Sequence, residues 1–136
     1  MSRTKHPPLA DLHPPQLASV PVLLVEADPD NRESIADALQ AEGFRVTALA
    51  TAAEALKKLD DPGCPTLIVL DLGMPGPGGR ELLAAVALRR DRERFRIILI
   101  SADPTAQALA TRPRVVEVLR KPFALDHLFD AIRRHG

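Results

Sequence analysis

Three runs of four apolar residues constrain this sequence more than any other feature: Val22–Val25, Leu67–Leu70 and Ile97–Ile100. Successive side chains of an extended strand point to opposite faces, so each run would be apolar on both faces. Such strands are typical of a parallel sheet with helices packed against both sides. Two further runs, Phe44–Leu49 and Val115–Leu119, raise the number of predicted strands to five.

Segments with helical spacing alternate with these strands. The first begins at Asp28, whose carboxylate can accept hydrogen bonds from free amide groups, while Pro29 suits the first helical position and Gly43 would end the helix. The other predicted helices start at Thr51, follow Gly79, and run from Leu125 to Arg134 with an apolar stripe of Leu125, Leu128, Phe129 and Ile132. For a fourth helix only about eight residues, Pro104–Thr111, are available before Pro113, which predicts a short helix or an irregular loop.

Five strands that alternate with helices imply a three-layer α/β domain. Right-handed crossovers leave few ways to connect them, and at 136 residues the flavodoxin-like strand order 2-1-3-4-5 is the natural one. We therefore predict a (βα)5 domain with a parallel five-stranded sheet over residues 21–136. Residues 1–20 are rich in proline and are predicted to form a flexible N-terminal extension.

Polar residues follow four of the predicted strands. Glu26 and Asp28 follow the first strand, Asp71 the third, Ser101 the fourth and Lys121 the fifth. In the predicted topology these strand ends share one edge of the sheet, beside the switch point between the first and third strands, where open α/β sheets bind their ligands. We therefore expect carboxylates, a hydroxyl and an ammonium group to converge on one site.

Such a cluster has the parts that phosphoryl transfer requires. A carboxylate can attack phosphorus and form an aspartyl phosphate, and Asp71 is the candidate because it ends a buried strand. Magnesium, held by one or two carboxylates with waters and the phosphate, can neutralise the phosphoryl oxygens. A lysine can pair with the same oxygens, and a serine hydroxyl can donate to the new phosphoryl group and move its loop inward. A buried Asp71 needs a partner, and Lys121 is placed to be one.

Four segments resemble those of bacterial response-regulator receiver domains, in the same order and at close to the usual spacing. They correspond to the acidic end of the first strand, the acceptor strand and loop, the switch-hydroxyl strand and the lysine–proline segment: Val22–Asn31, Leu67–Gly76, Ile98–Ala102 and Leu119–Phe123. The resemblance covers about residues 21–136. It implies a receiver domain in which the peptide bond before Pro122 is usually cis.

The resemblance also implies roles for individual residues. It implies a phosphoryl acceptor at Asp71, a phosphate-binding lysine at Lys121 and a switch hydroxyl at Ser101. The implied magnesium ligands are Glu26, Asp71 and the backbone carbonyl of Gly73, with Asp28 as a further candidate. Asp28 is better placed to cap the following helix than to bind a metal.

Three departures from the family pattern make this an atypical receiver. The family usually has two adjacent acids after the first strand, and the second binds the metal, but here the second is Ala27. We therefore predict weakened magnesium binding. The family usually has an aromatic residue three positions before the lysine, where this chain has Val118, and a valine cannot make the large rotamer swing of the usual relay from the hydroxyl. The segment Thr111–Arg114 follows an unusually short fourth helix, which predicts a remodelled output face.

The leading functional prediction is a two-component signalling receiver that takes a phosphoryl group from a phosphohistidine onto Asp71. The donor would be a sensor histidine kinase or a histidine phosphotransfer protein, and the signal would pass to a downstream protein target. The alternative is a pseudo-receiver that binds partners without phosphorylation, which Ala27 and Val118 favour and Asp71, Ser101 and Lys121 oppose. The chain is not predicted to be an enzyme beyond self-catalysed phosphoryl transfer and autodephosphorylation. A flavin-binding domain is disfavoured, because flavin sites favour stacked aromatic side chains and no Phe lies in the acceptor loop.

The composition indicates which kinds of partner and which cellular compartment to expect. Eighteen Lys and Arg residues balance eighteen Asp and Glu residues, which gives no reason to expect nucleic acid. No apolar run approaches the ~18 residues of a membrane span, and the single cysteine, Cys64, suits a reducing compartment, so a cytoplasmic location is predicted. The sequence stops soon after the last helix, which predicts a stand-alone receiver, with a weak homodimer as a further form of association.

Overall fold

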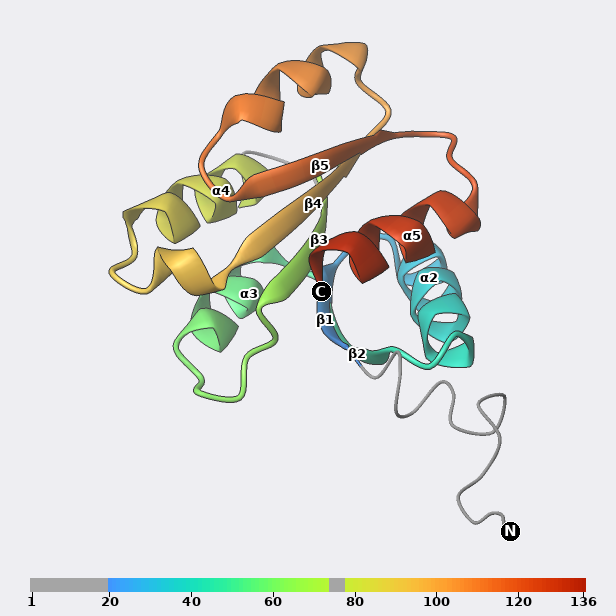
Figure 1. The fold of residues 1–136 in the computed structure, drawn as a ribbon, viewed down its shortest axis with the longest axis horizontal. Helices are drawn as coiled ribbons and strands as arrows, with labels where there is room; N and C mark the ends of the chain where they lie inside the picture. The colour runs from blue at the N-terminus through green and yellow to red at the C-terminus, as the bar shows by residue number, and fades with distance from the viewer. Residues whose placement is uncertain (1–19, 74–77) are drawn as a thin grey trace, which may run out of the picture.

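The computed structural model describes residues 20–73 and 78–136 (Figure 1). Its centre is a parallel five-stranded sheet in the order β2-β1-β3-β4-β5. The strands are β1 (Pro21–Val25), β2 (Arg45–Leu49), β3 (Leu67–Asp71), β4 (Arg96–Ser101) and β5 (Val115–Arg120). The predicted flavodoxin-like fold and strand order are therefore confirmed.

Helices cover both faces of this sheet (Figure 1). The α-helices are α2 (Pro29–Ala41), α3 (Ala52–Leu59), α4 (Gly78–Leu88) and α5 (Leu125–His135). Two 3₁₀ helices complete the described elements: η1 (Arg92–Arg94) and η2 (Pro104–Thr111). The predicted short segment before β5 is thus a helix, although of the tighter 3₁₀ type.

Two separate apolar layers form the core, one on each face of the sheet. Leu23 and Val25 pack with buried residues of α3 and α4, whereas Val22 and Leu24 pack with those of α2 and α5. The alternation within β1 accounts for the apolar run in the sequence, because every side chain of the run enters one layer or the other. The core therefore holds the carboxyl ends of the strands at defined positions on both sides.

Local signals explain where the first helices begin and end. The Asp28 carboxylate accepts a hydrogen bond from the Asn31 amide at 2.9 Å and so caps α2, as predicted. Gly43 follows this helix with φ of 95°, a conformation that favours glycine. Thr51 and Glu54 form a reciprocal capping box at the start of α3.

Three details of the sequence-based prediction need correction or lie outside the described residues. Leu125 is 42% exposed and does not join the apolar stripe of α5, because it is the first residue of that helix and lies where the helix leaves the apolar layer. Phe44 is buried but precedes β2 instead of belonging to it. The predicted extension over residues 1–20 falls almost wholly on residues 1–19, outside the described part of the chain.

None of the helices within residues 20–73 and 78–136 has the length and apolarity of a membrane span.

Candidate functional site

The polar strand ends predicted from the sequence meet in one cavity. Asp71 ends β3, and β1 and β5 place Glu26 and Lys121 next to it at the carboxyl edge of the sheet. A cavity of about 400 Å³ opens between them, lined by Glu26, Ala27, Asp28, Pro29, Asn31, Asp71, Gly73 and Lys121. All the predicted metal and acceptor residues therefore lie around one space, and Ser101 lies just outside its lining.

Asp71 is the most constrained side chain of the site. It is only 2% exposed, yet two donors hold its carboxylate: the Lys121 ammonium at 2.7 Å from Oδ2 and the Gly73 amide at 2.7 Å from Oδ1. Burial alone would raise the pKa of Asp71, but hydrogen bonds with Glu26, Lys121 and Gly73 outweigh it and lower the pKa below its usual value. Asp71 therefore stays ionised at neutral pH and retains its nucleophilic oxygens.

The pKa of Glu26 is shifted in the opposite direction. Its pKa is raised from 4.5 to about 7, mainly by burial, and the neighbouring Asp71 carboxylate contributes to the increase because it can accept a hydrogen bond from protonated Glu26. The Asp28 amide donates to Glu26 Oε2 at 3.0 Å and opposes this shift. The remaining oxygen, Oε1, is buried and has no donor among the described residues when Glu26 is ionised. Glu26 therefore requires a proton or a cation at this position.

The loop between β1 and α2 is held by residues that the sequence analysis did not single out. Arg32 donates from Nη1 to the Glu26 and Ala27 carbonyl oxygens, at 3.0 and 3.2 Å. Asn31 lines the cavity from the first turn of α2. The helix cap predicted at Asp28 could have located Asn31 at the cavity, because the capped amide belongs to that residue. Ala27 packs against the apolar layer beneath α3 and α4 and offers no oxygen from its side chain.

Ser101 ends β4 one position beyond the residue that pairs with Asp71 in the sheet. It is 5% exposed, and its hydroxyl oxygen accepts a hydrogen bond from the Asp103 amide at 3.0 Å, whereas no acceptor for the hydroxyl proton lies among residues 20–73 and 78–136. The Lys121 amide donates to the Ser101 carbonyl at 2.8 Å, and the Lys121–Pro122 peptide bond is cis. The serine and lysine loops are therefore joined directly. Val118 lies half-buried against the layer beneath α3 and α4.

The donor set of the cavity fits a magnesium ion, although with fewer protein carboxylates than the family uses. The orphaned Oε1 of Glu26 and the carboxylate of Asp71 lie together, and Gly73 joins them in the cavity lining. The described residues contain no group of three or more His, Cys, Asp or Glu side chains that could hold a metal. Two carboxylates with waters are nevertheless a common magnesium set.

A second cavity, of about 440 Å³, adjoins the first. Glu26, Asn31 and Lys121 line both cavities, and Ile35, Ala102, Pro122 and Phe123 complete the lining of the second. It lies between α2 and the loop that leads to α5. The second cavity therefore has a more apolar lining than the first.

Replacement of Lys121 tests whether the ion pair with Asp71 stabilises the fold. We expect Lys121→Met to lower the free energy of unfolding by about 1–3 kcal/mol at pH 7, because it leaves a buried carboxylate without its cation. Arg120→Met, which places the same residue at the exposed neighbouring position, should change it by less than about 0.5 kcal/mol. Urea unfolding measures both, and equal stability of the two variants would argue against a stabilising ion pair.

Comparison with known proteins places residues 22–133 in one family. A family profile described as the response regulator receiver domain matches residues 22–133. The C4-dicarboxylate transport transcriptional regulatory protein DctD of Pseudomonas aeruginosa is 34% identical over 122 residues, which cover 86% of this chain and 25% of that protein. The transcriptional regulatory protein TcrA of Mycobacterium tuberculosis is 32% identical over 120 residues, covering 87% of this chain and 46% of that protein. The chain thus spans a quarter to a half of these relatives.

Solved structures show the same likeness. The response regulator TrrA of Thermotoga maritima, in complex with Mg²⁺ and BeF, has a TM-score of 0.72 and 29% identity, covering 84% of this chain and 96% of that one. A response regulator receiver protein from Pseudomonas putida has a TM-score of 0.76 and 27% identity, covering 87% and 98% of the two chains. The likeness extends over nearly the full length of both solved chains.

Proposed function

Because the chain belongs to the response regulator receiver domain family, we propose that Asp71 accepts a phosphoryl group from a phosphohistidine. Receiver domains generally take this group from histidine kinases, and a kinase or a histidine phosphotransfer protein would be the donor here. The observation that carries the proposal is the state of Asp71: a buried carboxylate held ionised by Lys121 and Gly73 at the mouth of a cavity. The receiver domain would extend over residues 21–136.

The residues of the cavity account for the transfer step. A carboxylate oxygen of Asp71 forms a bond to phosphorus, the phosphorus–nitrogen bond to the donor histidine breaks, and the imidazole nitrogen retains the electron pair and takes up a proton. Lys121 lies 2.7 Å from the Asp71 carboxylate and can shift its ammonium group to the phosphoryl oxygens. The protein contributes mainly position and charge, as is usual for phosphoryl transfer.

Magnesium would bind to Glu26, Asp71 and the backbone carbonyl of Gly73, and when bound it supplies positive charge for the phosphoryl oxygens. Glu26 must release its proton to serve as a ligand, since protonation occupies the oxygen that a cation would use. Asp28 lines the same cavity, but one of its oxygens already caps α2. Glu26 would therefore be the main ligand from the first strand.

The proposed signal runs through Ser101. Its hydroxyl proton can be donated to a phosphoryl group on Asp71, and this would draw the loop that leads into η2 toward the site. Val118 cannot make the rotamer swing of an aromatic side chain, so η2 itself would pass the change to a downstream protein. The expected readout is an altered protein contact at η2 and β5.

Incubation with acetyl phosphate and magnesium, followed by intact-mass spectrometry, tests the proposed function. We expect a mass increase of one phosphoryl group that disappears on treatment with hydroxylamine, which cleaves acyl phosphates. A chain that gains no mass under conditions in which a known receiver is modified would contradict the proposal and favour the pseudo-receiver.

The pseudo-receiver is the second candidate, and the observation that favours it is Ala27. Its methyl group packs into the apolar layer and leaves the position of the usual metal acid without a donor. In that function the fold would bind its partner through protein contacts alone. The intact Asp71–Lys121 pair is what weighs against it.

Restoration of the missing acid tests the effect of Ala27 on metal binding. We expect Ala27→Asp to tighten magnesium affinity by roughly tenfold or more, because it supplies a carboxylate beside Glu26 and Asp71. Ala27→Asn, a matched change without the charge, should tighten it much less. Magnesium titrations followed by amide NMR shifts measure all three proteins, and equal affinities of wild type and Ala27→Asp would show that Ala27 does not weaken the site.

A further inference from the structure

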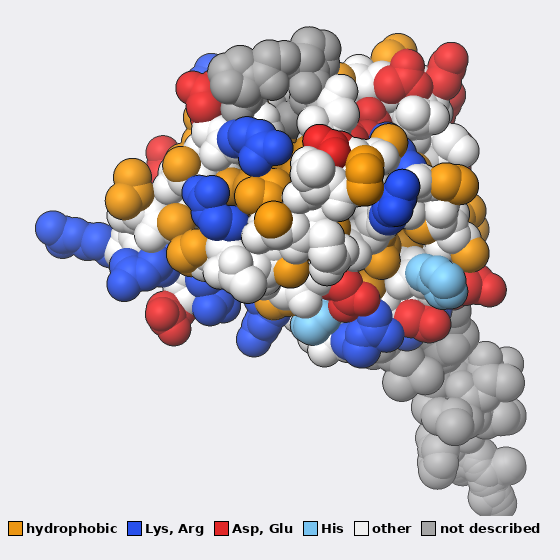
Figure 2. All heavy atoms as spheres, turned by 90° about the horizontal axis from the view of Figure 1, so that it is seen from above, with side chains coloured by type: hydrophobic (Ala, Val, Ile, Leu, Met, Phe, Trp, Pro, Cys, Tyr) orange, Lys and Arg blue, Asp and Glu red, His pale blue; other side chains and the backbone are white. Residues whose placement is uncertain are grey.

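The amino-terminal edge of the sheet, opposite Asp71, carries a concentration of arginine. Residues 89–96 contain five arginines against Asp91 and Glu93, and the turn before β5 adds Arg112 and Arg114. The Ile97 amide donates to the Arg114 carbonyl at 2.8 Å, so the two segments lie side by side. Figure 2 shows Lys and Arg side chains gathered at this end of the molecule, at the left of that view.

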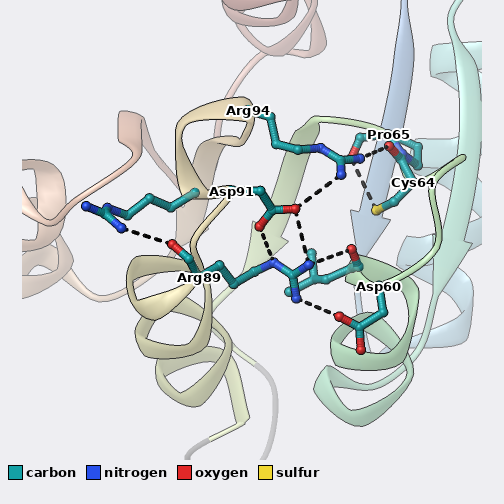
Figure 3. Close-up of polar contacts among 8 residues, drawn as sticks. Asp60, Cys64, Pro65, Arg89, Asp91 and Arg94 are labelled. Carbon is teal, nitrogen blue, oxygen red and sulfur yellow. Dashed lines mark hydrogen bonds and ion pairs between the residues drawn. The ribbon is translucent and has the colours of Figure 1, made fainter.

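Two of these arginines are used within the fold (Figure 3). Arg89 donates to both carboxylate oxygens of Asp91, at 2.7 and 3.2 Å, and to Asp60 at 2.8 Å. Arg94 donates to Asp91 at 3.2 Å, and its guanidinium lies 4.9 Å from the centroid of the Phe95 ring. This network holds the turn between α4 and β4 in a defined shape.

A third arginine joins the two segments. Arg114 donates to the carbonyl oxygens of Phe95 and Glu93, at 2.8 and 3.1 Å, and it adopts a positive φ of 68° that a residue other than glycine rarely takes. These hydrogen bonds offset the cost of that conformation, so the turn before β5 is anchored to η1.

Four arginines remain directed to solvent on this scaffold: Arg90, Arg92, Arg96 and Arg112. We call them the arginine platform. None of them has an ion-pair partner among residues 20–73 and 78–136, although Arg92 donates to the Arg89 carbonyl at 3.0 Å. Asp91 already forms ion pairs with Arg89 and Arg94, so Glu93 is the remaining carboxylate of the same segment. The platform therefore concentrates positive charge that the fold does not neutralise.

The positive charge of the platform differs from the charge of the rest of the molecule. The chain has no net charge, and α2 together with its N-cap Asp28 and C-cap Glu42 carries five carboxylates against Arg32 alone. The positive charge of the platform is thus local and would attract an anion at one end only. Each guanidinium presents a planar fork of donors that matches a carboxylate or a phosphate.

We propose that the arginine platform binds an acidic segment of a partner protein. A carboxylate-bearing segment fits better than nucleic acid, because the platform has only four side chains and Glu93 lies among them, whereas each strand of a duplex presents a phosphate about every 3.4 Å. The platform and the Asp71 cavity lie at opposite edges of the sheet. A partner on the platform therefore leaves the cavity open, and this proposal does not depend on phosphorylation.

Fluorescence anisotropy with a short labelled peptide of alternating Glu and Ala, at low salt, tests the proposal. We expect binding by the wild type that weakens as salt increases, and an affinity roughly tenfold lower for Arg90→Gln/Arg112→Gln. The control, Arg45→Gln/Arg80→Gln, changes the net charge equally but lies outside the platform, and its affinity should stay within about twofold of wild type. A peptide of alternating Gln and Ala should not bind.

Three results would overturn the proposal: no binding by the wild type, an equal loss in both double variants, or tighter binding of a short DNA duplex than of the acidic peptide. The last would identify a nucleic-acid surface instead. Amide NMR titration of the wild type keeps the test independent of the variants' folding. Shifts should appear at residues 90–96 and 112–114, and shifts confined to the Asp71 edge would also contradict the platform.

Discussion

Asp71→Asn is expected to abolish phosphoryl uptake from acetyl phosphate. The substitution keeps the shape of the side chain and an oxygen that can accept from the Gly73 amide, but an amide oxygen is not a competent nucleophile toward phosphorus. We expect no detectable mass increase in the variant under conditions that modify the wild type. Intact-mass spectrometry at several times after mixing measures this.

Two comparisons make the result specific. Asp37→Asn removes an exposed carboxylate of α2 that does not line the cavity, and this variant should be modified at the wild-type rate. Magnetic resonance or circular dichroism should show that Asp71→Asn is folded, as we expect because it removes a negative charge beside Glu26. If a folded Asp71→Asn still gains a phosphoryl group, another residue is the acceptor.

Glu26→Gln is expected to stabilise the metal-free protein by roughly 2–3 kcal/mol at pH 8. The pKa of Glu26 is raised from 4.5 to about 7, so between these values the folded chain binds more protons than the unfolded chain. The free energy of unfolding must therefore fall as pH rises from about 4.5 to 7. Glutamine is neutral throughout and removes this fall.

Asp71 affects the free energy of unfolding in a different range of pH. Its pKa is lowered from 3.8, so it contributes stability that is present above its ordinary pKa and lost as pH falls through its lower folded value. This window lies below about pH 4 and does not overlap that of Glu26.

Urea unfolding with a chelator present, at several pH values from 5 to 8, measures the effect. The wild type should lose stability across this range, Glu26→Gln should stay nearly constant, and Glu33→Gln, on the exposed face of α2, should follow the wild type. A pH dependence of Glu26→Gln equal to that of wild type would show that Glu26 does not hold the proton.

The sheet and the gathering of the strand ends could be predicted because they depend on local patterns. The apolar runs of β1, β3 and β4 required burial on both faces, and the two core layers bury them in that way. In the predicted strand order β3 and β5 end at the same edge of the sheet, and Asp71 and Lys121 form an ion pair there at 2.7 Å. Ala27 could be identified as a departure because the resemblance to receiver domains predicts an acid at that position.

Other features depend on tertiary contacts that no local pattern encodes. The raised pKa of Glu26 arises from burial beside Asp71, a residue 45 positions away in the sequence. The hydrogen bonds from Arg32 to the loop carbonyl oxygens and from Arg114 to the Phe95 carbonyl oxygen likewise depend on the fold. Leu125 shows the opposite case, since helical spacing suggested burial that the end of a helix does not provide.

Identification of the modified residue tests the central claim most directly. After reaction with acetyl phosphate and magnesium, borohydride reduction converts an aspartyl phosphate to homoserine, and trypsin releases residues 59–80, a peptide that contains Asp60, Asp61 and Asp71. Fragmentation of this peptide by tandem mass spectrometry locates the change. We predict homoserine at position 71 alone. Homoserine at Asp60 or Asp61, or an unmodified peptide, would contradict the assignment of Asp71 as the phosphoryl acceptor.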